Sequence, residues 1–273
     1  NGHLRTTVMD NDATMTPTPN RCALPRRFSD FATFGEALDY AAEGARGLNF
    51  HDARAKLTCV YPFAELRRDA LAMARRLIAR GVKPGARIAL VAQTCPEFAA
   101  LFCGAIYASA WPVPLPLPTS FGGKESYIDQ LAVQLESSDP SILLFPDEIA
   151  EMARASAERQ GCEAISFEDF GALPDADVPL PAPKADDICY LQYSSGSTRF
   201  PHGVAVTHRA LLNNLRGHGI GMKLVDNDRC VSWLPWYHDM GLVGCLLSPI
   251  ANQGATDYLK TEQCDYRELC PPV

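Results

Sequence analysis

The sequence lacks the cysteine and histidine patterns that define several protein classes. Its ten cysteines are scattered from Cys22 to Cys270 with no C-x-x-C pair, and its six histidines show no spacing typical of zinc ligands. Neither a disulfide framework nor a metal site is therefore expected. Scattered cysteines in apolar runs are typical of buried thiols in a reducing compartment, which predicts a cytoplasmic protein.

Long apolar runs and an excess of basic residues are also missing. The longest apolar run, 242–250, is interrupted by Gly244, Ser248 and Pro249, so no membrane span is expected. The first residues lack the apolar core of a signal peptide. A net charge of −7 gives no electrostatic footprint for nucleic acid, so no nucleic-acid partner is expected.

The composition that remains is that of a folded protein. Hydrophobic residues make up 47% of the 273 residues and charged residues 21%, which suits a globular chain of one or two domains. Residues 1–27 are polar, contain three prolines and show no periodicity, so we expect a flexible leader with order beginning near Phe28.

Two helices are predicted early in the chain. Thr33 and Glu36 form a capping-box pattern, which predicts a helix from there to about Gly47. An extended piece is expected over 57–61. Apolar residues then recur at helical spacing over 63–79, where a helix ending at Gly81 is predicted.

Strand-like and helix-like segments alternate after that point. Alternation of this kind predicts an α/β fold of parallel strands joined by crossover helices. A proline-rich stretch at 173–183 is expected to be a surface linker between two lobes. The expected strands are 87–92, an extended 111–117, 142–145, 164–167, 188–193, 230–234 and 255–259, and the expected helices are 97–110, 125–136, 148–159, 207–217 and 239–247.

The most informative stretch follows the predicted strand 188–193. Ser194, Ser195, Gly196, Ser197 and Thr198 form an unbroken run of hydroxyl and glycine residues before a predicted helix. Hydroxyls and unobstructed backbone N–H groups can surround a phosphate only where no large side chain blocks the approach. The stretch therefore predicts a nucleotide-binding loop.

Three commoner phosphate or nucleophile patterns do not fit. No second glycine, lysine and hydroxyl follow Gly196 at Walker spacing, and no G-x-S-x-G string occurs. Gly217, Gly219 and Gly221 are spaced wrongly for a dinucleotide fingerprint and are interpreted as a helix stop. A polar strand-to-helix turn without function is the remaining alternative.

A second stretch, Ser232 to Leu242, contains Trp233, Leu-Pro, Trp236, Tyr237, His238, Asp239, Met and Gly in direct succession. Together with Leu191-Gln192-Tyr193 and the hydroxyl loop, it resembles two successive motifs of the adenylate-forming superfamily. The residues of these motifs look most like those of the fatty-acyl-AMP ligases. The resemblance extends over about 28–259 and implies the layered parallel-sheet subdomains of the superfamily's large N-terminal domain, here incomplete.

The resemblance also implies roles for individual residues. Ser194, Ser195, Gly196, Ser197, Thr198 and Arg199 would bind ATP phosphates together with Mg2+, and Thr198 and His238 would be catalytic. Trp233, Trp236, Tyr237 and His238 would border the substrate pocket, although aromatic residues are more often core. Asp239 is expected to cap the following helix.

Two positions depart from the pattern of most acyl-CoA synthetases. Arg199 replaces a common glycine, and His202 stands where most of them have lysine. Both departures favour the fatty-acyl-AMP ligase branch, but a neutral histidine stabilises pyrophosphate less than an ammonium does. His202 therefore stays open between a catalytic residue and an exposed turn residue.

The implied activity is ATP-dependent conversion of a medium- to long-chain fatty acid to an acyl-adenylate, with release of pyrophosphate. The acyl group would pass to an acyl carrier protein or downstream synthase module of a polyketide or lipopeptide pathway. The superfamily's adenine-binding motif, ribose-binding Asp and C-terminal domain are not found, and 260–273 does not resemble the family's continuation. A fragment is therefore expected. An acyl-CoA synthetase and a non-catalytic nucleotide- or acyl-binding remnant are the alternatives.

Overall fold

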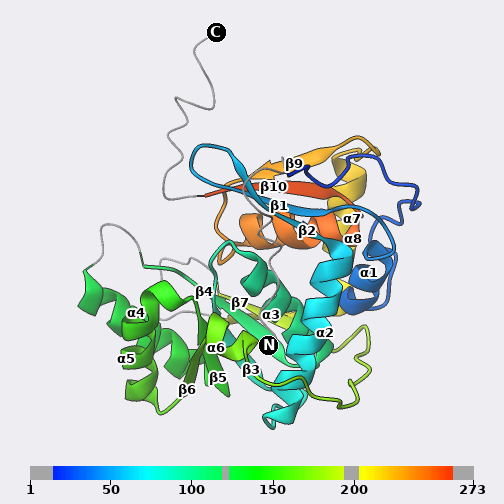
Figure 1. The fold of residues 1–273 in the computed structure, drawn as a ribbon. Coiled ribbons are helices and arrows are strands. Elements are labelled where there is room, and N and C mark those ends of the chain that lie inside the picture. Colours follow the sequence, from blue (N-terminus) through cyan, green and yellow to red (C-terminus); the bar gives the residue numbers. More distant parts are fainter. Residues whose placement is uncertain (1–14, 119–122, 194–202, 261–273) are drawn as a thin grey trace.

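A computed structural model of the protein describes residues 15–118, 123–193 and 203–260, which form three sheets and their covering helices (Figure 1). The helices are α1 (Phe34–Ala41), α2 (Phe63–Ala79), α3 (Pro96–Tyr107), α4 (Lys124–Ser138), η1 (Asp147–Ile149), α5 (Ala150–Gln160), α6 (Phe167–Gly171), α7 (His208–Gly221), the π-helix η2 (Met240–Leu247) and α8 (Ser248–Ala251). The strands are β1 (Gly47–His51), β2 (Leu57–Pro62), β3 (Arg87–Val91), β4 (Trp111–Leu115), β5 (Ile142–Phe145), β6 (Glu163–Ser166), β7 (Ile188–Tyr193), β8 (Gly203–Thr207), β9 (Arg229–Ser232) and β10 (Ala255–Leu259).

The first sheet has the order β4-β3-β5-β6 with every neighbouring pair parallel. Because successive side chains of a strand point to opposite faces, β3 contributes Ile88 and Leu90 to one hydrophobic core and Ala89 and Val91 to another. Helices α4 and α5 cover the second of these cores (Figure 1). Apolar residues on both faces are what a parallel sheet between helix layers requires, so the predicted α/β class is confirmed.

A second sheet has the order β2-β1-β10-β9, in which β1 pairs parallel to β10 and antiparallel to β2. It lies above the first sheet in Figure 1, and α3 lies between the two. One continuous core joins both sheets through side chains such as Leu48, Leu90 and Phe102. Strands β7 and β8 form an antiparallel pair that makes up the third sheet.

One buried arginine joins distant parts of the chain to the second sheet. Arg46 is 1% exposed, and its guanidinium donates to the carbonyl oxygens of Asn20, Asp226 and Gln253 at 2.8, 2.6 and 2.6 Å. Thr18 is also buried, and its backbone N–H donates to Oδ1 of Asn49 at 2.9 Å. Residues 15–27 therefore pack on the protein without forming a helix or strand, so ordered packing begins before Phe28.

The N-terminal helix is shorter than its sequence predicts. The cap is confirmed, since Oγ1 of Thr33 accepts from the N–H of Glu36 at 3.3 Å. The end near Gly47 is wrong, because α1 ends at Ala41 and Gly47 opens β1. A Cβ on Gly47 would lie 2.3 Å from the carbonyl oxygen of Tyr61, so the close approach of β1 to β2 requires glycine there.

Most other elements lie where the sequence predicts them. Helix α2 and strands β5 and β10 have the predicted bounds, and Thr207 caps α7 through an N–H···O bond of 3.1 Å from Ala210. Helix α7 continues through the glycine cluster and ends after Gly221. Strands β1 and β8 are additions to the prediction. Residues 173–183 contain no helix or strand.

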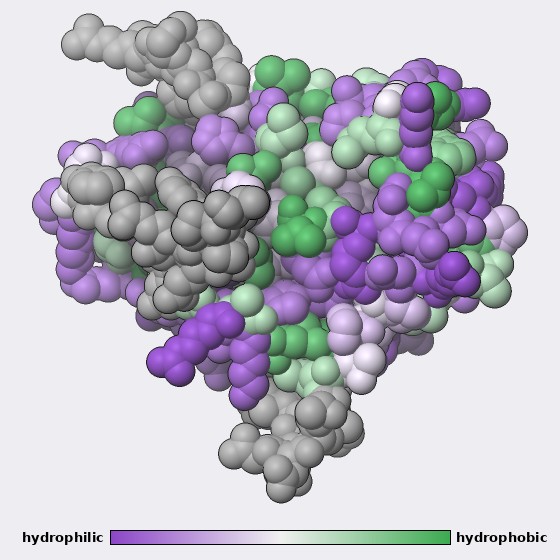
Figure 2. All heavy atoms as spheres, turned by 90° about the horizontal axis from the view of Figure 1, so that it is seen from above, coloured by the Kyte–Doolittle hydropathy of each residue, from purple (hydrophilic) through white to green (hydrophobic). Residues whose placement is uncertain are grey.

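The surface seen from above is largely hydrophilic, with hydrophobic side chains scattered across it (Figure 2). No helix in the described ranges is both long enough and apolar enough to cross a membrane.

Candidate functional site

The two strands that flank the predicted phosphate loop form a paired anchor. Tyr193, the last residue of β7, lies opposite Gly203, the first residue of β8. The hydroxyl of Tyr193 donates to Oγ of Ser137 on α4 at 3.0 Å. The two residues that flank the predicted loop therefore lie at adjacent strand ends. Its predicted site residues, Ser194, Ser195, Gly196, Ser197, Thr198 and Arg199, and also His202, lie outside the described residues.

A hydrogen bond joins this anchor to the second motif. Gln192 on β7 donates from Nε2 to the carbonyl oxygen of Tyr237 at 3.0 Å. Its other amide atom, Oε1, is buried and has no partner among the described residues. Two motifs whose contacting residues are 45 positions apart in sequence therefore meet in space. Local sequence patterns did not reveal this contact, although Gln192 belongs to the resembling Leu-Gln-Tyr triplet.

The second motif follows a tight path between β9 and η2. The backbone N–H of His238 donates to the carbonyl oxygen of Pro235 at 3.2 Å, and the ring centroids of Tyr237 and His238 are 4.9 Å apart. A Cβ on Gly241 would lie 2.2 Å from the carbonyl oxygen of Pro235. Glycine is therefore required where the helix crosses the motif backbone. The side chain of His238 is exposed at this turn.

The aromatic residues of the motif divide between core and surface. Trp236 is 0% exposed, with its ring centroid 4.9 Å from that of Tyr258 and 5.5 Å from that of Phe98. Trp233, by contrast, is 51% exposed. The structure places Trp236 within the core, in contrast to the predicted pocket wall, because its large ring fills the space between the sheets.

Asp239 has the predicted capping position. Its Oδ1 accepts from the backbone N–H of Met240 at 2.7 Å, at the start of η2. This contact explains Asp239 without a role as a general base.

The π-helix has a local cause near its end. Proline has no N–H, so Pro249 cannot donate to the carbonyl of Cys245, four residues earlier. That carbonyl accepts instead from the hydroxyl of Tyr258 on β10, at 2.7 Å. The side chain of a neighbouring strand thus satisfies the carbonyl that the proline leaves free. π-Helical turns within helices are frequently found at functional sites.

A cavity of about 370 Å³ lies beside the second motif. Helix α7, η2 and the β7–β8 pair line it, and Asp239 and Met240 belong to its lining on the motif side. Most of its lining is aliphatic or small, and a few polar groups are added, a lining typical of small-molecule sites. The remaining lining residues are Tyr190, Val206, Ala210, Leu211, Asn214, His218, Val243 and Gly244.

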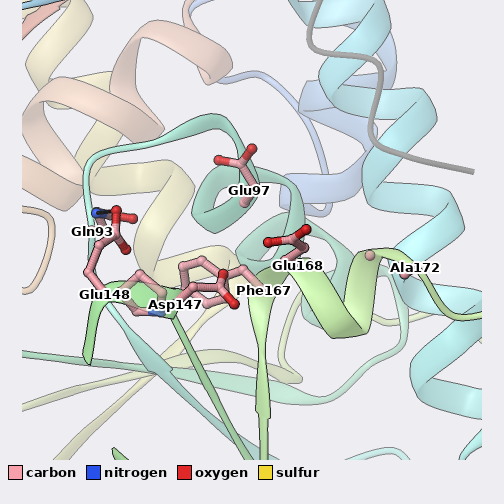
Figure 3. A pocket seen from close by; sticks show the side chains of 9 residues that line it. Gln93, Glu97, Asp147, Glu148, Phe167, Glu168 and Ala172 are labelled. Atoms are coloured by element: carbon pink, nitrogen blue, oxygen red, sulfur yellow. Dashed lines mark hydrogen bonds between the residues drawn. The ribbon is translucent and has the colours of Figure 1, made fainter. Parts of the chain in front are cut away.

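A second cavity, of about 470 Å³, lies at the carboxyl ends of β3, β5 and β6 (Figure 3). Four carboxylates line it, and Gln93 donates from Nε2 to one of them, Oε1 of Glu148, at 3.4 Å. Like charges disfavour an anionic ligand, so this cavity is unsuited to a triphosphate or a carboxylate substrate. The carboxylates belong to Glu97, Asp147, Glu148 and Glu168.

Comparison with known proteins identifies the class to which this fold and these motifs belong. The family model described as "AMP-binding enzyme" matches residues 41–269. The chain belongs to this family, and the resemblance drawn from the two motifs is confirmed.

The similar proteins include fatty-acyl ligases. The chain is 43% identical over 250 residues to a "Putative acyl-CoA synthetase" of Caulobacter vibrioides, a match that covers 89% of the chain and 43% of that protein. It is 35% identical over 176 residues to the long-chain-fatty-acid–AMP ligase FadD32 of Mycolicibacterium smegmatis, which covers 62% of the chain and 27% of that protein. The chain thus spans less than half the length of these relatives.

Solved structures agree with the fold. A structure from studies of fatty acyl-adenylate ligases of E. coli and L. pneumophila matches with a TM-score of 0.85 at 44% identity, over 89% of this chain and 44% of that one. A fatty acyl-adenylate ligase of L. pneumophila in complex with acyl adenylate and pyrophosphate matches with a TM-score of 0.72 at 26% identity, over 87% of this chain and 41% of that one.

Proposed function

We propose that this chain supplies the phosphate loop and part of the acyl site of an enzyme that joins a fatty acid to the α-phosphate of ATP and releases pyrophosphate. The single observation that carries the proposal is the hydrogen bond from Gln192 to the carbonyl of Tyr237, 3.0 Å long. It brings the strand that leads into the hydroxyl loop against the motif that contains His238. An adenylating enzyme needs such proximity, because it must hold two anionic reactants together.

The residue types of the loop suit a phosphate chain. Hydroxyls and N–H groups of Ser194, Ser195, Gly196, Ser197 and Thr198 would donate to phosphoryl oxygens, and Arg199 adds a fixed positive charge. Bound ATP supplies the phosphorus that accepts the carboxylate, and Mg2+ would share the charge of the departing pyrophosphate. Thr198 and His238 would act as catalytic residues by holding the reacting groups in place.

The acyl chain of the substrate would enter the cavity of about 370 Å³ beside η2. Its aliphatic lining suits a hydrocarbon, and the exposed imidazole of His238 follows directly on Tyr237, whose backbone Gln192 fixes. His238, Tyr237 and Trp233 would border the carboxylate end of the substrate. Trp236 would stabilise the motif from the core, because its ring packs against Phe98 and Tyr258.

The product would be an acyl-adenylate of a medium- to long-chain fatty acid, made in the cytoplasm. Transfer to an acyl carrier protein or synthase module of a polyketide or lipopeptide pathway is the use we propose for it. The fatty-acyl-AMP ligases among the similar proteins support the choice of substrate class. Our proposed division of the chain has 28–259 as the partial adenylation domain, with its linker near 173–183, and 260–273 as a tail. Of the proposed leader, 1–27, residues 15–27 pack on this domain.

An acyl-CoA synthetase is the second candidate, favoured by the name of the 43% identical relative. The two activities differ in the acceptor, since one passes the acyl group to a carrier protein and the other to coenzyme A. A non-catalytic nucleotide- or acyl-binding remnant is the third candidate.

ATP–pyrophosphate exchange with a panel of fatty acids tests the proposal. We expect exchange from a protein in which this chain is extended to the length of its relatives. If neither the chain nor the extended protein catalysed exchange, only the third candidate, a non-catalytic binding remnant, would remain. Rapid formation of acyl-CoA by the extended protein would favour the second candidate.

A single substitution tests the loop itself. Thr198→Ala should lower exchange by about tenfold to a hundredfold, since one hydroxyl that stabilises a developing charge is lost. Thr16→Ala is the matched control, because Thr16 is exposed and distant in sequence from both motifs. Equal exchange rates in Thr198→Ala and Thr16→Ala would refute the role of Thr198.

A further inference from the structure

Two cavities follow one another along α7. The first is the cavity of about 370 Å³ beside the second motif, and the other, which we call the distal cavity, has a volume of about 340 Å³. Helix α7 contributes His218 to the first cavity, and its C-cap residue Met222 lines the distal cavity. Because positions four residues apart lie on the same face of a helix, one face of α7 passes both cavities.

The opposite wall has the same arrangement. Met240 and Val243 of η2 line the first cavity, and Gly244 lines both. Ser248, four residues further along at the start of α8, lines the distal cavity. The two cavities therefore adjoin at Gly244, and the distal cavity lies beyond it from the motif residue Asp239.

The passage between the cavities is narrow but free of a side chain on the η2 side. A Cβ built on Gly244 would lie 3.6 Å from Sδ of Met240 and 3.7 Å from Cε1 of His218, which are ordinary van der Waals distances. A methyl group would thus fit, whereas a larger side chain would extend into the passage. Nδ1 of His218 is buried and has no hydrogen-bond partner among the described residues, so a turn of the imidazole breaks no hydrogen bond at that atom.

The distal cavity suits a hydrocarbon although charged residues line it, because their charged ends have partners in the protein. The guanidinium of Arg26 donates to the carbonyl oxygens of Asn252 and Val225 at 2.7 and 3.0 Å. Oδ2 of Asp228 accepts from the N–H of Val225 at 2.7 Å, and Arg229 donates to a carboxylate of β10 at 2.7 Å. The apolar lining residues are Met222, Leu224, Pro249 and Ala255.

We propose that the far end of a long, unbranched acyl chain passes between Gly244 and His218 into the distal cavity, and that Gly244 thereby determines the chain length that the protein accepts. The inference rests on the proposed function, because it takes the first cavity as the acyl site. That cavity alone is near the lower limit of ligand pockets, about 300 Å³, and the distal cavity nearly doubles the space. A linear chain fits a passage that a branched chain would not.

Calorimetric titration of the chain with octanoate, dodecanoate and hexadecanoate is the first test. Each methylene group that leaves water strengthens binding by up to about fourfold. We expect hexadecanoate to bind at least about a hundredfold more tightly than octanoate, with dodecanoate between them. A wild-type ratio near one would overturn the proposal, since the added methylene groups would then remain in water.

Substitution of Gly244 tests the passage. In Gly244→Leu the ratio of the affinities for hexadecanoate and octanoate should fall below about tenfold, because the added side chain blocks the longer acid. Gly244→Ala should give an intermediate ratio, and its methyl group fits without a clash, so the test does not depend on the folding of the leucine variant.

Gly217→Leu is the matched control. Gly217 is exposed on the same helix as His218, and a Cβ there meets no neighbouring residue within 4 Å. The affinity ratio should therefore remain that of the wild type. Equal ratios in Gly244→Leu and Gly217→Leu would refute the role of Gly244.

The distal cavity can be tested separately. Leu224 lines it and belongs to neither motif, so the indole of Leu224→Trp would fill space that the end of hexadecanoate needs. The ratio of affinities for hexadecanoate and octanoate should fall at least about tenfold. An unchanged ratio would show that the acyl chain ends elsewhere and would overturn the proposal.

Exchange assays on the extended protein separate this inference from the proposed function. If the extended wild-type protein exchanges pyrophosphate with both acids, and Gly244→Leu and Leu224→Trp keep its chain-length preference, only the present inference fails. If no acid supports exchange while the binding ratios change as expected, the two cavities bind an acyl chain and the proposed adenylation fails instead.

Discussion

The two four-stranded sheets differ in what stabilises them. The sheet β4-β3-β5-β6 is parallel throughout, and strands such as Ile142–Phe145 contain only apolar residues. The sheet β2-β1-β10-β9 contains buried polar residues that form hydrogen bonds, among them Asn49 and Ser232. The first sheet is an aliphatic layer between helices, whereas the second depends on specific hydrogen bonds.

This difference between the sheets coincides with the position of the second motif and of the cavity proposed for the acyl chain. The motif with His238 leaves β9, and the cavity proposed for the acyl chain is lined by η2, which packs on β9. Buried polar groups constrain geometry more strictly than aliphatic packing does, because each needs a partner at a defined distance. The second sheet should therefore tolerate substitutions less well than the first, and it holds the motif in a defined position.

The largest effect is expected from a cavity in the aliphatic sheet. Leu144 is fully buried on β5, between Leu90 of β3 and Ile165 of β6. Leu144→Ala should lower the free energy of unfolding by about 4 kcal/mol in urea denaturation. Val133→Ala on α4, where the side chain is 45% exposed, is the control and should change it by less than about 1 kcal/mol. Similar losses in both variants would contradict the role of aliphatic packing.

A comparable effect in the polar sheet should arise without a large change in volume. Arg46→Met keeps an unbranched side chain but removes the donors to three carbonyls, those of Asn20, Asp226 and Gln253. We expect a loss of about 3 kcal/mol, measured by the same denaturation, because buried carbonyls lose charged partners. Arg54→Met, at an exposed position, is the control. If both variants were equally stable, hydrogen bonding would not distinguish the two sheets.

A smaller effect is expected from one hydroxyl. Tyr258→Phe leaves the carbonyl of Cys245 without its donor, and unfolding free energy should fall by about 2 kcal/mol. Tyr40→Phe provides the comparison, because the Tyr40 hydroxyl donates to the carbonyl of Pro25 at an exposed site. The loss should be clearly larger at position 258, and a larger loss at position 40 would contradict the account of the π-helix.

The smallest effect should appear as a pH dependence. Nδ1 of His208 accepts from the N–H of Phe34 at 3.1 Å, and burial lowers the pKa of His208 below 6.5, against the opposing charges of Asp187 and Glu36. Because the folded state binds the proton more weakly than the unfolded state, this stabilisation is complete above pH 6.5 and is lost as the pH falls toward the lower folded pKa. The melting temperature between pH 8 and pH 5 should fall less in His208→Asn. An equal fall in both proteins would show that His208 is not responsible.

Sequence patterns predicted the fold best where a segment folds on local information. Helix α2 and strand β5 follow from periodicity and composition alone. The prediction of a helix to Gly47 was wrong because Gly47 opens β1, which pairs with β2 and β10. No local signal reports the pairing of Leu48 with Thr256, which lie far apart in the sequence.

The family could be predicted from the sequence, but the arrangement of the site residues could be predicted only in part. The two motifs sufficed for the superfamily, and Asp239 caps its helix as expected. The core position of Trp236 agrees with the general preference of aromatic residues for the core, although its place in the motif favoured a pocket wall. The contact of Gln192 with Tyr237 and the cavity beside η2 need the tertiary structure, because their residues come from separate elements.

The pairing of β1 with β10 has a consequence for synthesis of the protein. Residues 47–51 must wait until 255–259 have been made before their sheet can close, whereas β3 to β6 all lie within 87–166. Because the N-terminal parts of a chain fold first during translation and distant contacts form slowly, the aliphatic sheet should fold on the ribosome well before the other. Hydrogen exchange on stalled nascent chains ending near residue 200 should therefore show stronger protection of β3 and β5 than of β1, which has only β2 to pair with.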